Sequence, residues 1–454
     1  MLLNLAFIFQ IIVPGSPKLK PRSAGCRGIS AVGARNPRRY CRLGVNMYIH
    51  KFTIRNFLIH RQTSIDLSPI TVLVGPNGGG KSALFDAVLN FSMLARGSIR
   101  QAFGPYPYSY TASKYRGTIA IGRVGFDVVM SKSQQDQERL HYTINYAQQG
   151  VAEPGNPTFM IFTESLKSSD GTPLFDRDNP DASPLKKALE YVADDIGILA
   201  AVRKAEIDGK SDGFATVSEL AKEIGRFNRF RLSPHELSRP SRLPEIEEPL
   251  SPPRLGYEGE DLAACLFYMN EKKDPALAKI IEELTAVLPE FEGFEFNMVG
   301  VEKVAFSMRF SDGRGTINAA RMSHGNLLFL GLMVLTYTSN RPPVMLLEEP
   351  ENGLTPQAIE HFYSAVRALA NREDVRQRSQ VLISSHSPFV ICEAWNGEDR
   401  DFIHQVKIEN GHGIVRKFSE VVAENTGPLG KDKTGARTVL SLKNASELMS
   451  GYLQ

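Results

Sequence analysis

The alternation of hydrophobic and polar residues predicts strands in both halves of a long chain. Residues 48–57 alternate apolar and polar side chains, which is typical of a strand with one buried face. Three short, mostly apolar runs, at 69–74, 343–347 and 380–384, indicate strands that are buried on both faces of a sheet. Residues 82–94 repeat apolar side chains at helical spacing, so we expect a helix soon after the first of these strands.

The middle of the chain predicts other elements. Residues 118–162 contain four apolar stretches that indicate a β-meander, and residues 185–227 predict short helices. Six prolines between 234 and 253 are typical of a linker or surface loop. Two further helices are expected between 259 and 288. No heptad repeat persists for three cycles, so a long coiled coil is not expected.

Composition and charge narrow the class of protein. The chain has 454 residues, of which 42% are hydrophobic and 23% charged, as in ordinary globular proteins. The net charge is +3, but the first 46 residues hold eight Lys or Arg and no acidic residue. Residues 47–454 therefore carry 45 basic and 50 acidic residues, a net charge of −5. This part has no overall basic excess that would indicate nucleic-acid binding.

The four cysteines predict the compartment. Cys26, Cys41, Cys265 and Cys392 include no CxxC pair and no cluster with histidine. The sequence therefore predicts neither a disulfide framework nor a zinc site. We expect a reducing, cytoplasmic location.

Residues 1–46 differ from the rest of the chain. An apolar run at 2–13 precedes a loose basic stretch, but no basic residue precedes that run, as a signal peptide requires. Twelve residues are also too few to span a bilayer, so no membrane association is expected. A transit peptide, a disordered basic extension and a mis-assigned start before Met47 remain open. At the other end, residues 426–454 are expected to form a solvated tail or, through Lys431, Lys433 and Arg437, a partner contact.

The run at 69–74 leads into a complete GxxxxGK[ST] loop. The glycines let the backbone N–H groups turn inward around phosphates, Lys81 can reach the terminal phosphate oxygens, and the Ser82 hydroxyl can ligate Mg²⁺. The following helix adds its positive N-terminal end. The residues expected to bind the nucleotide here are Gly75, Pro76, Asn77, Gly78, Gly79, Gly80, Lys81, Ser82 and Ala83.

Two carboxylates follow the apolar run at 343–347. Because adjacent residues on a strand point to opposite faces, Glu348 and Glu349 can serve different tasks. We assign Glu348 to Mg²⁺ and Glu349 to the attacking water. A solvated acidic turn is the alternative, and the complete phosphate loop argues against it.

Two further segments carry candidate phosphate ligands. Ser323 and Gly325 stand at the start of an apolar helix, where a hydroxyl and backbone amides can bind a γ-phosphate, although Ser323 could also be only a helix cap. His386 ends the run at 380–384, and an imidazole there can hydrogen-bond the γ-phosphate.

The order of these motifs resembles the ABC-type ATPase heads of the RecF/SMC/OLD group, and most closely compact bacterial AAA family ATPases with a RecF-like core. The resemblance covers residues 47 to about 420. It implies that 75–82 is Walker A, Glu348 and Glu349 are the Walker B pair, 323–326 is the signature loop, 351–354 is the D-loop, and His386 is the switch histidine. It also implies an α/β P-loop NTPase of ABC/RecF type, with a mixed central sheet, flanking helices, the β-meander and a helical insertion.

This fold implies a division of the chain. The N-terminal half of the ATPase core is expected at 47–165, a helical insertion with the proline-rich loop at 166–295, the C-terminal half at 296–425, and the tail at 426–454. A separation of 267 positions between Lys81 and Glu348 argues against a hexameric AAA+ motor, in which the two Walker motifs lie closer.

Three features depart from the group. Glu348 stands where ABC proteins usually have Asp, and the signature segment lacks the double glycine of transporter ATPases. The Q-loop glutamine has only one weak candidate, Gln101, which is equally well explained as an exposed loop residue.

The resemblance implies an Mg²⁺-dependent ATPase in which ATP is sandwiched between two heads, so that Ser323 acts on the nucleotide of a second copy. DNA repair or recombination and anti-phage defence are the uses it implies, with DNA or a separate effector protein as candidate partners. A nucleotide-gated binding module with little turnover is the rival interpretation. A transporter ATPase subunit is the third.

Overall fold

A computed structural model describes residues 47–103, 122–153, 156–210, 214–243, 252–372, 378–397, 399–426 and 440–450. These belong to one compact unit, Leu43–Gln454. The expected N-terminal extension, residues 118–121 and 154–155 of the predicted meander, and Lys431, Lys433 and Arg437 of the tail lie outside the described residues.

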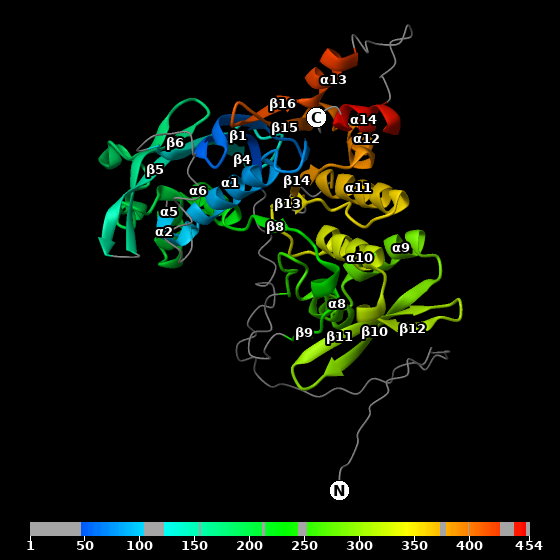
Figure 1. The fold of residues 1–454 in the computed structure, drawn as a ribbon. Helices are drawn as coiled ribbons and strands as arrows, with labels where there is room; N and C mark the ends of the chain where they lie inside the picture. The colour runs from blue at the N-terminus through cyan, green and yellow to red at the C-terminus, as the bar shows by residue number, and fades with distance from the viewer. Residues whose placement is uncertain are drawn as a thin grey trace, which may run out of the picture. The chain divides into compact units, whose positions relative to one another are not determined.

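The central layer is a mixed sheet that contains all three predicted buried strands (Figure 1). Its neighbouring strands from β15 to β8 run parallel, and β16 is an antiparallel edge. In spatial order the strands are β16 (His412–Lys417), β15 (Ile403–Glu409), β3 (Ile70–Val74), β14 (Gln380–Ser385), β13 (Val344–Glu348) and β8 (Asn228–Phe230).

The central strands are buried because their side chains enter two different cores. Every residue of β3, β13 and β14 is buried. Val72 packs into one core cluster, whereas the next residue, Leu73, packs into the other. Alternation of this kind explains why the sequence shows continuous apolar runs instead of an alternating pattern.

An antiparallel sheet covers one face of this layer, with helix α1 (Lys81–Leu94) packed into the core that the two share. Aromatic rings fill that core: Phe91 lies 5.7 Å from Phe52 between ring centroids, and Phe52 lies 5.6 Å from Phe126. The strands, in spatial order, are β2 (His60–Asp66), β1 (Tyr48–Phe57), β4 (Val124–Ser131), β5 (Leu140–Glu153), β6 (Asn156–Ser168) and β7 (Pro173–Asp176). The expected strand at 48–57 and the expected helix after 82 are thus confirmed.

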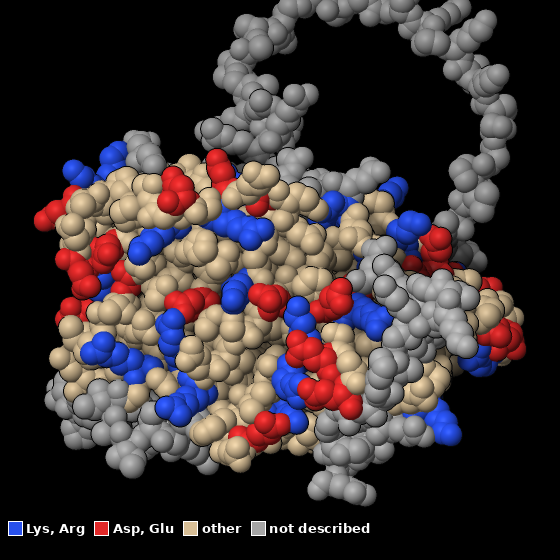
Figure 2. Space-filling model, turned by 90° about the horizontal axis from the view of Figure 1, so that it is seen from above, with Lys and Arg blue, Asp and Glu red and all other residues tan. Residues whose placement is uncertain are grey.

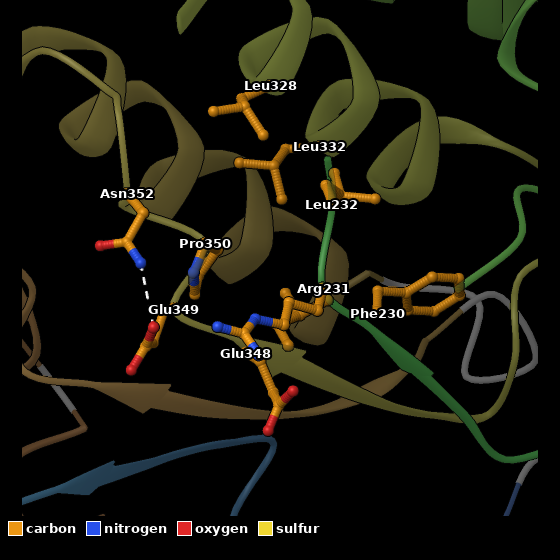
Figure 3. A pocket seen from close by; sticks show the side chains of 10 residues that line it. Phe230, Arg231, Leu232, Leu328, Leu332, Glu348, Glu349, Pro350 and Asn352 are labelled. Atoms are coloured by element: carbon orange, nitrogen blue, oxygen red, sulfur yellow. Dashed lines mark hydrogen bonds between the residues drawn. The ribbon is translucent and has the colours of Figure 1, made fainter. Parts of the chain in front are cut away.

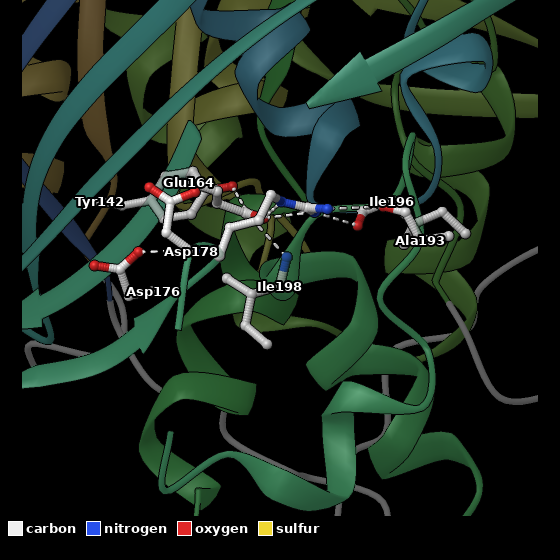
Figure 4. Close-up of polar contacts among 8 residues, drawn as sticks. Tyr142, Glu164, Asp176, Asp178, Ala193, Ile196 and Ile198 are labelled. Atoms are coloured by element: carbon white, nitrogen blue, oxygen red, sulfur yellow. Dashed lines mark hydrogen bonds and ion pairs between the residues drawn. The ribbon is translucent and has the colours of Figure 1, made fainter. Parts of the chain in front are cut away.

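A buried ionic cluster ties the start of helix α5 (Ile198–Ile207) to this antiparallel sheet (Figure 4). Glu164 on β6 accepts hydrogen bonds from the Tyr142 hydroxyl (2.6 Å), the Arg177 guanidinium (2.9 Å) and the backbone N–H of Ile198 (2.7 Å). Burial raises the pKa of Glu164, while Arg177 opposes that effect. The short helices are α2 (Ile99–Ala102), α4 (Lys186–Leu189), α5 (Ile198–Ile207) and α6 (Ala215–Ile224), with a 3₁₀ turn at Pro180–Ala182.

Helices cover the other face of the central layer, and a small sheet packs against helices α8 (Leu262–Glu271) and α9 (Pro275–Val287) (Figure 1). The helices are α7 (Pro234–Leu237), α8 (Leu262–Glu271), α9 (Pro275–Val287), α10 (His324–Tyr337), α11 (Pro356–Ala370), α12 (Pro388–Asn396), α13 (Phe418–Thr426) and α14 (Leu442–Ser450). The small sheet holds β10 (Phe291–Val299), β11 (Lys303–Phe310) and β12 (Gly315–Asn318), and β9 (Ser241–Arg242) pairs with β11. Two 3₁₀ turns lie at Ala319–Arg321 and Arg400–Phe402.

The segment 166–295 differs from the expected helical insertion. It contains β8, which joins the central sheet beside β13, as well as β7, β9 and the first residues of β10. A three-residue strand is too short to give a readable alternation, which is why the sequence did not reveal it. The proline-rich stretch likewise begins in helix α7, because Pro234 occupies a first-turn position that needs no N–H.

Candidate functional site

The phosphate loop joins the end of β3 to the start of α1, as the sequence predicts. Its glycines are required by close packing. A Cβ on Gly75 would lie 2.0 Å from the Val406 carbonyl oxygen, and one on Gly80 would lie 2.3 Å from the Ile59 side chain. Gly78 and Gly80 also have φ values of 77° and 105°, in the left-handed region that favours glycine.

Lys81 is held inside this loop. Its Nζ donates to the carbonyl oxygens of Gly75 (2.8 Å) and Pro76 (3.0 Å), and the residue is only 6% exposed. Burial lowers the pKa of Lys81, while the nearby carboxylates of Glu349, Glu351 and Glu348 act in the opposite direction. These negative charges therefore favour the protonated form of Lys81.

A histidine supports the loop from β2. His60 is fully buried, its Nε2 lies 3.3 Å from the Gly80 carbonyl oxygen, and its Nδ1 lies 2.9 Å from the Thr63 hydroxyl. Burial lowers the pKa of His60 to about 4, so the imidazole is neutral at physiological pH. The sequence analysis did not identify His60, because a histidine in an alternating strand carries no signal of what it touches.

Three parallel strands bring the predicted motifs together at one edge of the sheet. Because β3, β14 and β13 are neighbours, their carboxyl ends meet, as ligand sites in such sheets do. A cavity of about 310 Å³ lies there. Its lining residues are Leu58, Ile59, Asn77, Gly78, Gly79, Gly80, Lys81, Ser82, Ala83, Arg231, Glu348, Glu349 and Ser384.

Glu348 and Ser82 both line this cavity, and Ser82 is one of the groups that lower the pKa of Glu348. Arg229 forms an ion pair with Glu348, and the Tyr257 hydroxyl donates to its Oε2 (3.2 Å). Burial would raise the pKa of Glu348, but hydrogen bonds from Arg229 and Ser82 outweigh it and hold that pKa below its ordinary value. The carboxylate is therefore charged.

This pair of oxygen donors fits Mg²⁺. No group of three or more His, Cys, Asp or Glu in the described part of the chain is arranged to hold a metal ion. Mg²⁺ needs no such group, because in nucleotide sites it takes one or two protein oxygens and completes its shell with phosphate oxygens and water.

Glu349 lies just past the end of β13, in a left-handed conformation with φ of 43°. Its N–H donates to the Ser384 carbonyl oxygen (2.9 Å), and its Oε2 accepts from the Asn352 amide (3.0 Å). Because Glu349 lies outside the strand and has a positive φ, the alternation expected of adjacent strand residues does not apply to it, and both glutamates line the same cavity. Strain of this kind commonly marks functional residues.

His386 reaches Glu349 but does not line the cavity. Its Nδ1 lies 3.4 Å from Glu349 Oε1. Beneath them Glu351, at 6% exposure, accepts from the Ser385 hydroxyl (2.6 Å) and the His386 N–H (3.3 Å). Burial raises the pKa of Glu351. Glu351 thus ties the end of β14 to the turn after β13, a role that its place in the expected D-loop does not indicate.

Ser323 and Gly325 lie apart from the cavity residues. Ser323 caps α10, its hydroxyl accepting from the Asn326 N–H (3.3 Å), and it is exposed. A Cβ on Gly325 would lie 2.6 Å from the Gly353 carbonyl oxygen, so the expected signature and D-loop segments pack closely. Gln101 serves α2 as a capping residue and does not line the cavity.

Besides His60, four site residues carried no recognisable signal in the sequence: Arg229 and Arg231 at the end of β8, Asp86 on α1, and Tyr257. Figure 3 shows how the segment from Phe230 to Leu232 runs beside Glu348 and Glu349. The only available signal was a pair of arginines two residues apart, and nothing in the sequence placed them beside β13.

Comparisons with known proteins agree with this arrangement. The family described as "AAA domain, putative AbiEii toxin, Type IV TA system" matches residues 159–392, more than half of the chain. The family "AAA ATPase domain" matches residues 47–144. No curated protein matches the chain.

Similar solved structures include three SMC heads. The SMC head bound to the C-winged helix domain of ScpA is 11% identical, with 82% of this chain and 99% of that chain covered and a TM-score of 0.48. For the SMC head domain from Thermotoga maritima the values are 14%, 81%, 98% and 0.41. For the Pyrococcus furiosus Smc head with an extended coiled coil, bound to the C-terminal domain of ScpA, they are 12%, 83%, 98% and 0.42.

Proposed function

This chain belongs to the AAA-domain family described as "putative AbiEii toxin, Type IV TA system", and on that premise we propose that it binds ATP with Mg²⁺ and hydrolyses it. One observation carries the proposal. The phosphate loop, the Ser82–Glu348 pair and Glu349 line a single cavity, although 267 positions separate Lys81 from Glu348.

Each side chain has a role that follows from its position. Lys81 and the loop N–H groups hold the phosphates, and Ser82 and Glu348 hold the metal. Mg²⁺, when bound, neutralises charge on the phosphate oxygens. Glu349 orients or deprotonates the attacking water, and His386, 3.4 Å from Glu349, hydrogen-bonds either that carboxylate or the γ-phosphate.

A second copy of the chain would complete the site. Ser323 is exposed at the start of α10 and is absent from the cavity that holds Lys81. A hydroxyl and backbone amides at the start of a 14-residue helix suit a phosphate. We therefore infer that ATP brings two heads together, with Ser323 and Gly325 of each facing the nucleotide of the other.

Turnover and assembly test this proposal together. Glu349→Gln keeps the side-chain shape but removes the base, so turnover should fall about 10²- to 10⁴-fold while ATP-dependent dimers persist in light scattering. Lys81→Ala should abolish both. Glu360→Gln, at an exposed position of α11, is the matched control and should change neither. A wild-type protein that binds ATP with negligible turnover would instead indicate a nucleotide-gated binding module.

The process that ATP hydrolysis by this chain would drive is a separate part of the proposal. The family description favours a defence role in a toxin–antitoxin system, and DNA repair or recombination is the alternative. On the face seen in Figure 2, basic and acidic side chains of the described residues are interspersed and do not gather into one basic patch. ATP turnover measured with and without double-stranded DNA at several salt concentrations separates the two roles. Stimulation by DNA that fades as salt rises would support DNA repair or recombination, because contacts to DNA phosphates weaken steeply with salt, and no effect of DNA would favour the defence role.

Within the described residues, the helices are all too short or too polar to cross a membrane.

A further inference from the structure

Two arginines, Arg229 and Arg231, stand two residues apart at the end of β8, next to the end of β13 where Glu348 and Glu349 lie. The parallel register pairs Leu346 with Arg229 and Leu347 with Phe230, so Arg231 comes level with Glu348. Residues two apart on an extended segment point to the same face. Arg229 and Arg231 therefore both project toward the candidate site.

Arg229 is committed to protein partners. Its guanidinium forms ion pairs with Glu348 on β13 and with Asp86 on α1, and its side chain is 15% exposed. These contacts hold the Glu348 carboxylate at the wall of the cavity. Arg229 is thus occupied by the wall of the cavity and is not available to a ligand.

Arg231 has the opposite surroundings. It is exposed, and it lines both the 310 Å³ cavity of the phosphate loop and a smaller cavity of about 60 Å³ beside Glu349 and Pro350. Figure 3 shows its side chain extending from the strand end toward the glutamates. Its backbone N–H donates to the Tyr257 carbonyl oxygen (2.9 Å), which fixes the base of the side chain. Within the described part of the chain, its guanidinium has no hydrogen bond or ion pair.

We propose that Arg231 contacts the terminal phosphate of the bound nucleotide and makes the site prefer a triphosphate to a diphosphate. The inference rests on the proposed function and adds a residue to it. Lys81 and the loop amides surround the inner phosphates, whereas the glutamate side of the cavity is where the terminal phosphate and the attacking water must lie. Arg231 reaches that side. A guanidinium matches phosphate oxygens with two parallel hydrogen bonds.

The charge at this point favours the same role. Glu348 and Glu349 place two carboxylates beside the position of the terminal phosphate, which itself carries negative charge. Besides Lys81, the only cation whose side chain lines the cavity within the described residues is Arg231. Without Arg231, less positive charge would offset the repulsion between the terminal phosphate and the two glutamates than Lys81 and the loop amides provide for the inner phosphates.

Nucleotide affinity tests the inference. Binding of ADP and of a non-hydrolysable ATP analogue is measured by calorimetry in Mg²⁺ for the wild type, Arg231→Ala, Arg231→Lys, Lys81→Ala and Arg61→Ala. Arg61, exposed on β2 and outside the cavity, is the matched control. Arg231→Ala should weaken the ATP analogue about tenfold or more and ADP less than about threefold. Arg231→Lys should fall between, because lysine keeps the charge but loses the paired geometry.

The outcomes separate this inference from the proposed function. If Lys81→Ala weakens both nucleotides while Arg231→Ala changes neither, or weakens both equally, the Arg231 assignment is wrong and the ATP site stands. If the wild type binds neither nucleotide, both proposals fall. Unchanged melting temperatures for the Arg231 variants exclude misfolding as the cause of a loss.

Discussion

The ion pair between Arg229 and Glu348 gives a stability test of the candidate site that does not depend on any activity. The Glu348 side chain is 5% exposed and that of Arg229 is 15% exposed, so the pair is largely removed from water. Removing one partner of such a pair costs about 3–5 kcal/mol, because the remaining charge stays buried without compensation. Replacing both partners by apolar side chains of similar size is often nearly neutral.

We therefore expect Arg229→Met and Glu348→Met each to lower the free energy of unfolding by about 3 kcal/mol or more. The double variant should lose less stability than the sum of the two single variants, and the part that remains reflects Asp86, which loses its ion pair whenever Arg229 is replaced. A matched cycle on Arg309 and Glu292, a 3.0 Å pair whose side chains are 47% and 44% exposed, should give a coupling of about 0–1 kcal/mol. Urea unfolding at neutral pH measures all the variants. Additive losses below about 1 kcal/mol at Arg229 and Glu348 would refute the buried contact on which the site depends.

Three further predictions follow from the same geometry. Gly75→Ala should abolish nucleotide binding in calorimetry, because the added Cβ would lie 2.0 Å from the Val406 carbonyl oxygen. Gly78→Ala, whose Cβ would have no atom within 4 Å, should lower the free energy of unfolding in urea by only about 1–2 kcal/mol. Equal effects of the two substitutions would contradict this packing. Burial lowers the pKa values of His60 and His404 from 6.5 to about 4. Between pH 6.5 and 4 these two histidines are therefore protonated in the unfolded chain but still neutral in the folded protein. Each histidine should cost about 3 kcal/mol of stability as the pH falls from 6.5 to 4, and His60→Gln should flatten that loss in unfolding curves; an unchanged slope would argue against a neutral His60. Burial raises the pKa of Glu351, so the folded state binds this proton more tightly and stability should fall as the pH rises above 4.5. Glu351→Gln should remove that fall in the same assay; a variant whose stability drops with pH as steeply as the wild type's would count against a buried, proton-retaining carboxyl.

Much of the core was predictable because its signals are local. The apolar runs that became β3, β13 and β14 each end in a polar motif, and parallel neighbours place those ends together. The expected AAA family ATPase core and the α/β fold are confirmed. The roles assigned to Lys81, Glu349 and His386 stay predictions until activity is measured.

What the sequence could not reveal depends on contacts between distant segments. Arg229 and Arg231 lie beside the two glutamates only because the three-residue strand β8 pairs with β13. Glu349 lines the same cavity as Glu348 and has a positive φ. A positive φ at a residue other than glycine cannot be predicted from the sequence. Tyr257 and Asp86 contact Glu348 and Arg229, which belong to distant parts of the chain. The spacing of these residues along the sequence therefore gives no recognisable motif.

The most direct test of the central claim is an experimental structure with Mg²⁺ and a non-hydrolysable ATP analogue. We expect one nucleotide whose phosphates lie in the loop 75–82, with the metal between the Ser82 hydroxyl and the Glu348 carboxylate and a water molecule beside Glu349. A nucleotide bound elsewhere, or a metal that neither Ser82 nor Glu348 contacts, would contradict it.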